Sequence, residues 1–344
     1  MAATGTEIKS ALKKASAWGA GVACGANNGV LTLPHTLKKD RAGIEEDSLG
    51  LYFPRELSQG DIKVEGTVPA YLRYDSLDLL IGLAMGDCGG SPVQQGTTSA
   101  YAQSFKLKES LDGLFATFAV NNGINIDEYT SLKVAGFTLK GEVGKPVQAA
   151  FQAVANDRVT NSAVNTGASF AAVTYFEQAN RVLFSQGVFR MNAQAGPALA
   201  DGDKIYPSNF ELTFKRKMKG LYAAGGADRI DEPTNEGAPE VKLKLEFPRY
   251  TAKTYFEDWD SGAAKKMDIV FTGALIEGSY YRTMKLQFPN LKLSNVELPI
   301  EKGILKHPLE FECLACDSAP SGMTGITKPF QIDVINRQSA NVLG

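Results

Sequence analysis

Apolar and polar residues alternate in two stretches of the chain that align with each other. Apolar residues at positions 62, 64 and 68 alternate with polar ones before a Pro-x-Tyr triplet, and those at 241, 243, 245 and 247 do the same before a second such triplet. Because successive side chains of a strand point to opposite faces, each stretch is predicted to be a strand with one buried face. Residues 29–71 align with 208–250 without a gap. The pattern therefore indicates a β-rich unit that occurs twice.

A second aligned pair of predicted strands contains a change of phase. Positions 132 and 134 are apolar on one face, and after Gly136 the apolar positions shift to 137 and 139. In the later unit, apolar residues at 284, 286 and 288 shift to 291 and 293 across Pro289 and Asn290. A phase change within a strand needs a bulge or bend, where Gly and Pro are favoured. We therefore predict a bend at the same place in both units.

Each unit is also predicted to carry one short amphipathic helix after its Pro-x-Tyr strand. The apolar positions are 77, 80, 81 and 84 in the first unit and 252, 255, 256 and 259 in the second, which is helical spacing. Asp75 and Thr251 are candidate caps at the two helix starts, and Gly86 and Gly262 follow the two helix ends.

These elements predict a mainly β protein with two tandem homologous domains, each a β-sandwich or half-barrel with a flanking short α-helix. A length of 344 residues is about twice that of an ordinary domain, which fits two cores. We expect a first domain at residues 1–157, a linker at 158–180, a second domain at 181–317 and a C-terminal arm at 318–344. One place for this arm is on a neighbouring subunit.

The charge balance argues against nucleic-acid binding by a basic surface, since the net charge is -2 and 22% of residues are charged. The N-terminal stretch carries Lys9, Lys13 and Lys14 and has no continuous apolar run. It therefore resembles neither a signal peptide nor a membrane span. We expect a chain that is made in a cytoplasm and does not enter a membrane.

Four cysteines raise the question of a metal or redox site: Cys24, Cys88, Cys313 and Cys316. The last two form a CxxC motif, but a zinc site needs two further close ligands and no second CxxC exists. Cys313 aligns with Phe151 in a predicted strand, which favours a small core residue. We expect no metal, cofactor or disulfide to support the fold.

The chain offers little that catalysis could use. Asp258 and Asp260 lie with Glu257 around a tryptophan on the second predicted helix, where a solvated helix face is the favoured interpretation. Residues 201–203 (DGD) lack the spacing of a calcium loop, and residues 141–145 (GEVGK) lack that of a phosphate-binding loop. Both histidines lie beside prolines without a nearby Ser or Cys motif. We therefore expect no enzymatic activity.

Two long loops occupy equivalent positions in the two units, Lys38–Gly60 and Met218–Pro239. Loops of this length that carry apolar residues suggest partner-binding arms. The alternative is that each loop folds back on its own domain. The candidate contact residues are Glu45, Glu46, Asp47, Leu49, Leu51, Tyr52, Phe53, Leu221, Tyr222, Asp228, Ile230 and Asp231.

Three segments resemble the tail tube (major tail) proteins of long-tailed bacteriophages. They are Trp18-Gly19, the run PAYLRYDSLDLLIGLAMGD at 69–87, and residues 181–214 from RVLFSQGVFRMN to NFELTF. The resemblance covers roughly residues 5–317, and its motifs are packing motifs without catalytic residues. It implies a β-sandwich with a flanking helix that assembles into rings. The rings would stack into a hollow tube, and a long loop would bridge neighbouring rings. By position, that role falls on Lys38–Gly60 and Met218–Pro239.

The resemblance also implies partners and a location. The chain would contact itself, the tail terminator, the tape measure and the distal tail proteins, and double-stranded DNA would pass transiently and non-specifically during ejection. It would be a structural protein of the virion tail tube, made in the host bacterial cytoplasm. Where one tube domain per chain gives a hexamer, two per chain predict a homotrimer that forms a pseudo-hexameric ring.

A tube that lets DNA pass is expected to have a neutral to acidic inner wall, because clustered lysines and arginines would bind phosphates. The 36 basic residues would then lie at subunit and ring contacts. Other hypotheses remain open at this stage. One is another β-rich virion protein, such as a capsid decoration or baseplate protein. Another is a carbohydrate-binding β-sandwich, or a glycosidase that uses Asp258 and Asp260.

Overall fold

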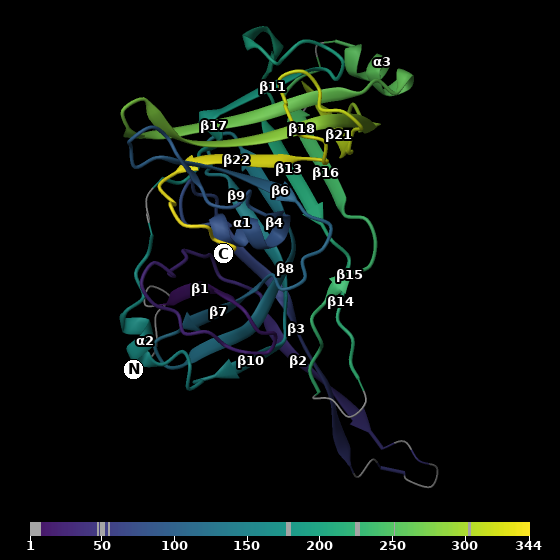
Figure 1. Ribbon diagram of the computed structural model, residues 1–344. Helices are drawn as coiled ribbons and strands as arrows, with labels where there is room; N and C mark the ends of the chain where they lie inside the picture. The colour runs from purple at the N-terminus through teal and green to yellow at the C-terminus, as the bar shows by residue number, and fades with distance from the viewer. Residues whose placement is uncertain are drawn as a thin grey trace.

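The computed structural model describes residues 8–46, 48, 52–53, 56–176, 180–223, 228–250, 252–301 and 304–344. These residues form long antiparallel strands with a few short helices (Figure 1). The predicted mainly β fold class is confirmed.

The elements of the first half of the chain are β1 (Lys9–Ala15), β2 (Lys38–Glu45), β3 (Leu57–Tyr71), α1 (Asp78–Met85), β4 (Gly86–Asp87), β5 (Val93–Gln94), β6 (Tyr101–Leu107), β7 (Phe115–Asn121), β8 (Ile126–Glu142), β9 (Gln148–Ala155), β10 (Asp157–Thr160) and α2 (Gly167–Ala171). Those of the second half are β11 (Gly187–Ala193), β12 (Lys204–Ile205), β13 (Asn209–Lys215), β14 (Met218–Lys219), β15 (Thr234–Asn235), β16 (Glu240–Phe247), α3 (Thr254–Ser261), β17 (Lys265–Glu277), β18 (Tyr280–Val296), β19 (Ile300–Glu301), β20 (Ile304–Leu305), β21 (His307–Cys313) and β22 (Gln331–Asn336). Short 3-10 turns lie at Phe184–Gln186 and Asp201–Asp203.

One continuous antiparallel sheet runs through both halves. Its strand order is β2-β3-β9-β8-β13-β16-β21-β18, and the two halves meet where β8 pairs with β13. In that central pair Leu139 lies opposite Leu212, and Phe137 lies opposite Phe214. Alternate residues of these strands are buried, so one face of the sheet covers the core and the other is polar.

The two longest strands each belong to two sheets. The first part of β8 pairs with β7 and β10, and its last part pairs with β9 and β13. The first part of β18 pairs with β17 and β22, and its last part pairs with β21. The register shifts at Val134–Gly136 in β8 and between Phe288 and Leu291 in β18. Both bends predicted from the phase changes are confirmed.

Two outer sheets lie across the core from the long sheet. One has the order β1-β7-β8-β10, and the other has the order β12-β11-β17-β18-β22-β6, with β4 and β5 paired to β6. Helix α1 lies between the layers and contacts β8 and β6 (Figure 1).

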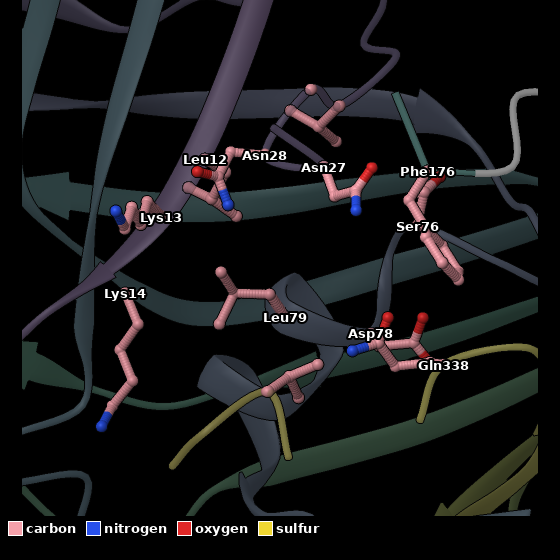
Figure 2. A pocket seen from close by; sticks show the side chains of 13 residues that line it. Leu12, Lys13, Lys14, Asn27, Asn28, Ser76, Asp78, Leu79, Phe176 and Gln338 are labelled. Atoms are coloured by element: carbon pink, nitrogen blue, oxygen red, sulfur yellow. The ribbon is translucent and has the colours of Figure 1, made fainter. Parts of the chain in front are cut away.

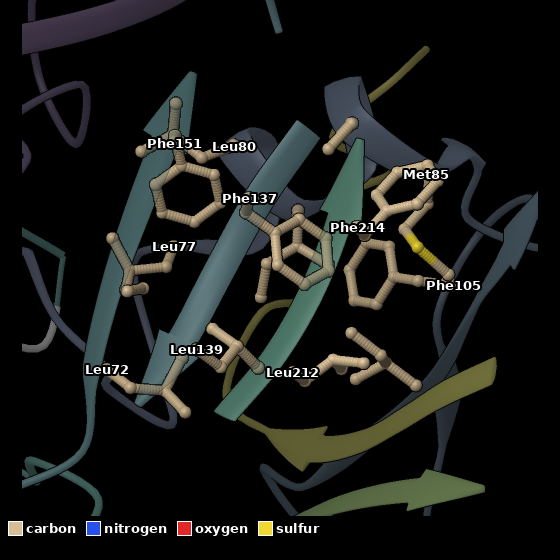
Figure 3. Packing of buried hydrophobic residues seen from close by; sticks show 14 of the residues in the cluster. Leu72, Leu77, Leu80, Met85, Phe105, Phe137, Leu139, Phe151, Leu212 and Phe214 are labelled. Atoms are coloured by element: carbon tan, nitrogen blue, oxygen red, sulfur yellow. The ribbon is translucent and has the colours of Figure 1, made fainter. Parts of the chain in front are cut away.

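The core joins both halves through a cluster of aromatic rings. Phe137 of β8 lies with its ring centroid 5.5 Å from that of Phe214 in β13, and the Phe214 ring lies 5.4 Å from that of Phe330. These are edge-to-face contacts, which add to the free energy gained by burial. Leu80 and Met85 of α1 pack over the same sheet (Figure 3). The helix is therefore held by residues from both halves.

The helix ends agree with the sequence pattern, but one cap does not. Gly86 and Gly262 each end their helix in the left-handed conformation, as predicted. Asp75 does not cap α1, because Leu77 occupies the cap position and makes no side-chain hydrogen bond. Asp75 is instead fully buried and ion-paired with Arg282 of β18, with Oδ2 2.7 Å from Nε. Thr251 lies outside the described residues.

The C-terminal segment pairs within its own chain, which corrects its expected place on a neighbour. Strand β22 lies between β18 and β6, with Val334 opposite Met284 on one side and opposite Gln103 on the other. Strand β6 follows α1, in a stretch where the first unit is longer than the second. The segment found only in the first unit, which contains β6, thus pairs with the segment beyond the second unit, which contains β22.

A buried polar network closes the contact between α1 and the C-terminal segment. The Asn336 side-chain amide donates to Asp78 Oδ1 at 2.8 Å and to the Tyr74 carbonyl at 2.9 Å, and the Arg337 backbone N–H donates to Asp75. Burial raises the pKa of Asp78 to about 7, and the nearby Asp75 charge adds to this, although the Asn336 hydrogen bond opposes it.

The bend in β8 generates the first prediction. A Cβ at Gly136 would stand 2.1 Å from the Phe214 carbonyl oxygen, on the strand that joins the halves. Gly136→Ala should therefore lower the free energy of unfolding by about 3 kcal/mol or more. Gly167→Ala is the control, because its Cβ would meet nothing within 4 Å, and it should change stability by less than about 1 kcal/mol. Urea denaturation measures both. Equal stabilities of the two variants would contradict the close approach of β8 to β13.

Asp78 generates a second prediction, on pH dependence. Its pKa is raised in the folded chain, so the folded state keeps the proton between about pH 4 and pH 7 while the unfolded state loses it. The stability contribution of Asp78 should fall as the pH rises through this window. Asp78→Asn cannot titrate. From pH 4 to pH 8, its free energy of unfolding should therefore rise relative to that of the wild type by up to a few kcal/mol, at about 1.4 kcal/mol per pKa unit. Thermal or urea unfolding at both pH values measures the difference. A constant difference would rule out the raised pKa.

Candidate assembly surfaces

The long sheet presents a polar face that carries both signs of charge. Its charged side chains are Lys38, Asp40, Asp61, Lys63, Glu65, Lys140, Glu142, Glu211, Lys215, Glu240, Lys242, Lys244, Glu246, Lys292, Glu310 and Glu312. They alternate with the buried residues of the same strands, so the pattern that fills the core also makes this face hydrophilic. Strands of both halves carry these charged positions.

Lysines and glutamates of this face pair along and between strands. Lys242 Nζ lies 3.1 Å from Glu240 and 3.4 Å from Glu312, and its hydrogen bonds to them raise the lysine pKa. Further pairs are Lys244 with Glu310, Lys140 with Glu211, and Lys306 with Glu246. Exposed pairs of this kind contribute little stability. Their effect is to leave the face without a concentrated charge of either sign.

Between the charged positions of β3 and β8, strand β9 forms an uncharged strip of the face. Strand β9 contributes Gln148, Ala150, Gln152 and Val154 to it, each at a position that alternates with a buried residue. A surface of amides and small side chains offers no fixed charge to a phosphate or to a cation.

The ends of the long sheet are open. Among the described residues, β2 pairs only with β3, and residues 292–296 of β18 pair only with β21. An open edge exposes a row of backbone donors and acceptors, so both edges can pair with another strand.

The loop predicted at Lys38–Gly60 is largely a hairpin of β2 and β3 that reaches beyond the rest of the chain (Figure 1). Its apolar side chains face solvent: Ile44 is 58% exposed, Tyr52 90%, Phe53 73% and Leu57 63%. Glu45 ends β2 opposite Leu57. Of the predicted contact residues, Glu45, Glu46, Tyr52 and Phe53 are therefore at an exposed tip. Asp47, Leu49 and Leu51 lie outside the described residues.

The loop predicted at Met218–Pro239 takes a different course. It lies beside the base of the β2–β3 hairpin (Figure 1), where the Tyr222 hydroxyl donates to the Ile62 carbonyl at 2.8 Å and Asp228 is ion-paired with Arg41. The Asp231 backbone N–H donates to the Leu221 carbonyl within the loop. This segment therefore packs against the first half of the chain, whereas the alternative placed each loop on its own domain.

Ile230 was predicted as an exposed contact, and it is only 5% exposed. Its carbonyl accepts hydrogen bonds from the Trp18 indole at 3.0 Å and from the Asn156 amide at 2.9 Å. The side chain thus has little surface to offer another subunit. Leu221 remains 61% exposed.

A pocket of about 240 Å³ lies between β1, the start of α1 and the C-terminal segment (Figure 2). Lys13, Lys14, Asp78 and Gln338 supply polar groups to its lining. Lys13 donates to the Ala23 carbonyl and Asp78 accepts from Asn336, so these groups serve contacts within the chain.

The other candidate polar groups are also engaged in local contacts. Asp258 lies 2.7 Å from Lys265, and Asp260 is exposed on α3. Asp203 accepts from the Ala200 backbone N–H in a 3-10 turn. Among the described residues, no group of three or more His, Cys, Asp or Glu side chains could hold a metal ion.

The four cysteines are free thiols, and three of them are buried. Burial raises the pKa of Cys24 to about 12 and that of Cys313 well above its ordinary value. A thiol with a raised pKa is a poor nucleophile at neutral pH, so these residues act as packing groups.

Sequence reasoning missed the residues that tie the halves together. Arg216 of the second half donates to the Met85 carbonyl at the end of α1 and to the Lys108 carbonyl directly after β6, and Lys133 Nζ lies 2.6 Å from Glu232. The alternating Lys and Glu of β16 and β21 can be read from the sequence as one charged face of two strands. Which Lys faces which Glu depends on the register of β16 and β21, two strands that are separated in the chain by α3 and the strands β17 to β20.

The family model described as phage tail tube protein matches residues 5–313. Comparison with curated proteins gives no match.

Proposed function

Because this chain belongs to the phage tail tube protein family, we propose that it polymerises as stacked rings into the hollow tail tube through which phage DNA passes during ejection. The observation that carries this proposal is the long sheet, which has one buried face, one polar face and two open edges. A wall segment of a water-filled tube needs each of these features. The role is structural, and we assign no catalytic step to the chain.

The strand pairings support two tail-tube domains in one chain. In each half an early strand pairs with a strand that follows the helix. β1 pairs with β7, which comes after α1 and the intervening β4, β5 and β6, and β11 pairs with β17, which comes directly after α3. The next strand is long, bends, and passes from an outer sheet into the long sheet as β8 or β18. We propose domains at 1–157 and 181–317 with a linker at 158–180, while residues 318–344 complete the outer sheet.

Two domains per chain lead to a ring of three chains. If the open edge of β2 in one subunit lies against β18 of the next, three copies of the long sheet close into one barrel. Closure removes both exposed edges, which would otherwise favour uncontrolled association. The homotrimeric ring would then have pseudo-sixfold symmetry.

Membership of the family also implies a place in the virion and contact with other tail components. We propose the tail terminator, tape measure and distal tail proteins as those partners, and the host bacterial cytoplasm as the site of synthesis. No helix of the described chain is long and apolar enough to cross a membrane.

The polar face of the long sheet is our candidate for the inner wall. Duplex DNA carries about one negative charge per 1.7 Å, and a wall of unpaired lysines would hold it through counterion release. The face places Lys242 and Lys244 within reach of glutamates and leaves β9 uncharged. DNA would meet a surface of balanced charge and could slide along it.

Ring symmetry is the third prediction. Purified protein imaged by negative-stain microscopy should give rings or tubes, and averaged end views should have threefold symmetry with alternating domains. Rings of six chains would contradict the count of two domains per chain. Protein that stays monomeric at high concentration and is absent from particle tails would contradict the tube itself.

The fourth prediction concerns which face points inward. Lys244→Cys places a thiol on the polar face of the long sheet, and Lys106→Cys places one on the exposed side of β6 in the outer layer. Both variants would be made with Cys316→Ser to remove the partly exposed native thiol. In assembled tubes, a maleimide coupled to a folded protein should label the cysteine at 106 and spare the one at 244.

A small maleimide should reach both cysteines in tubes, and unassembled subunits should react at both positions with either reagent. Rapid labelling at position 244 by the protein-sized reagent in intact tubes would exclude this face as the inner wall.

A further inference from the structure

The edge of β3 changes partner along its length. Strand β9 covers this edge as far as the pair of Val64 and Ala155. Beyond it, the Ile62 backbone N–H donates to the Asp228 carbonyl at 2.7 Å, and the Ile62 carbonyl accepts from the Tyr222 hydroxyl at 2.8 Å. Residues of the second half thus satisfy the β3 backbone where β9 ends.

A bulge in the hairpin lies next to this contact. The β2–β3 register shifts between Arg41 and Gly43. Arg41 Nε donates to the Gly60 carbonyl at 3.1 Å, and its guanidinium is also ion-paired with Asp228. A bulge bends and twists the strand that contains it. Arg41 therefore ties the bend of the hairpin to the second half.

The supporting segment is itself anchored to the body of the first half. Asp157 Oδ1 lies 2.6 Å from Lys39 of β2, and its Oδ2 lies 2.8 Å from Arg229. Burial alone would raise the pKa of Asp157, but hydrogen bonds from these two cations hold it below its ordinary value. The carboxylate is thus charged at neutral pH and joins hairpin, second half and β10.

Beyond Gly43 the described part of the hairpin has only its own two strands. No other described strand pairs with either edge there, and Ile44, Leu57, Tyr52 and Phe53 are exposed. A two-stranded hairpin is marginally stable in water, so a partner for these edges and side chains would stabilise it. In a family whose members assemble into a tube, that partner is a second copy of the same chain.

We infer that residues 218–223 and 228–236 form an intramolecular brace that sets the direction of the β2–β3 hairpin, and that the hairpin alone reaches a second copy in the next ring. This inference rests on the proposed tube function. The first loop is then an arm and the second loop is its support, so a ring of three chains carries three arms.

The test compares four sets of variants by the protein concentration at which tubes begin to grow, measured by sedimentation. The brace variant is Tyr222→Phe with Asp228→Asn, the arm variant is Tyr52→Ser with Phe53→Ser, and the control is Leu221→Ser, which changes an exposed brace side chain. Brace and arm variants should raise this concentration by about tenfold or more, since each loses contacts that orient or form the junction. The control should match the wild type, and all should keep its melting temperature within a few degrees.

The fourth set separates positioning from a general loss of stability. Asp228→Arg should impair tube growth by placing two cations together. Arg41→Asp added to it should restore growth in part, because the ion pair forms again with reversed charges while the hydrogen bond from Arg41 Nε to the Gly60 carbonyl is lost. Normal growth of the brace variant, or equal damage by Leu221→Ser, would overturn the brace. Wild-type protein that forms no tubes would instead refute the proposed function, so the two failures are distinguishable.

Discussion

The pairing of β8 with β13 is the constraint on which the rest of the structure depends. It joins the sheets of the two halves into one, and it exists because β8 bends at Gly136 and brings Phe137 opposite Phe214. Without a side chain at 136, the backbone of β13 can approach within van der Waals contact. The aromatic rings of this pair then pack against Phe330 and belong to the same core cluster as the buried residues of α1. Relative motion of the halves would break backbone hydrogen bonds and aromatic contacts together, so the two halves are held as one unit.

The local sequence pattern predicted the strands and helices. The roles of individual polar and loop residues depend on contacts between segments that are distant in the sequence. Alternation located the strands and the bend at Gly136, because these depend on neighbouring residues and on the buried face alone. The role of Asp75 was misjudged, since a carboxylate before a helix usually caps it, while here Arg282 is 207 residues away and competes successfully in a buried site. Ile230 was placed on the surface for a similar reason. An apolar residue in a long polar loop gives no local sign that Trp18 and Asn156 will donate hydrogen bonds to its carbonyl.

The charge pattern of the polar face follows from the same register that builds the core. Because β16 and β21 are antiparallel neighbours, Lys242 lies opposite Glu312 and Lys244 opposite Glu310. Opposite charges at paired positions favour this register and oppose slippage by one residue, which would also expose the apolar set. The near-neutral face is therefore a consequence of folding as well as a property suited to a conduit. A wall that had to be strongly basic could not use these cross-strand pairs.

An internal repeat allows one copy of a feature to be lost while the other is kept. The first half projects its hairpin, whereas the second half holds the equivalent segment against Ile62 and Arg41. A long two-stranded arm supported only at its root would swing, and the entropy of that motion would be lost each time a contact formed. Support from the same chain removes part of this loss before assembly, because the brace is already in place when the subunit folds. In the proposed tube, the second copy would thus strengthen ring junctions without touching the next ring, and the hairpin that does touch it would meet its partner in a defined direction.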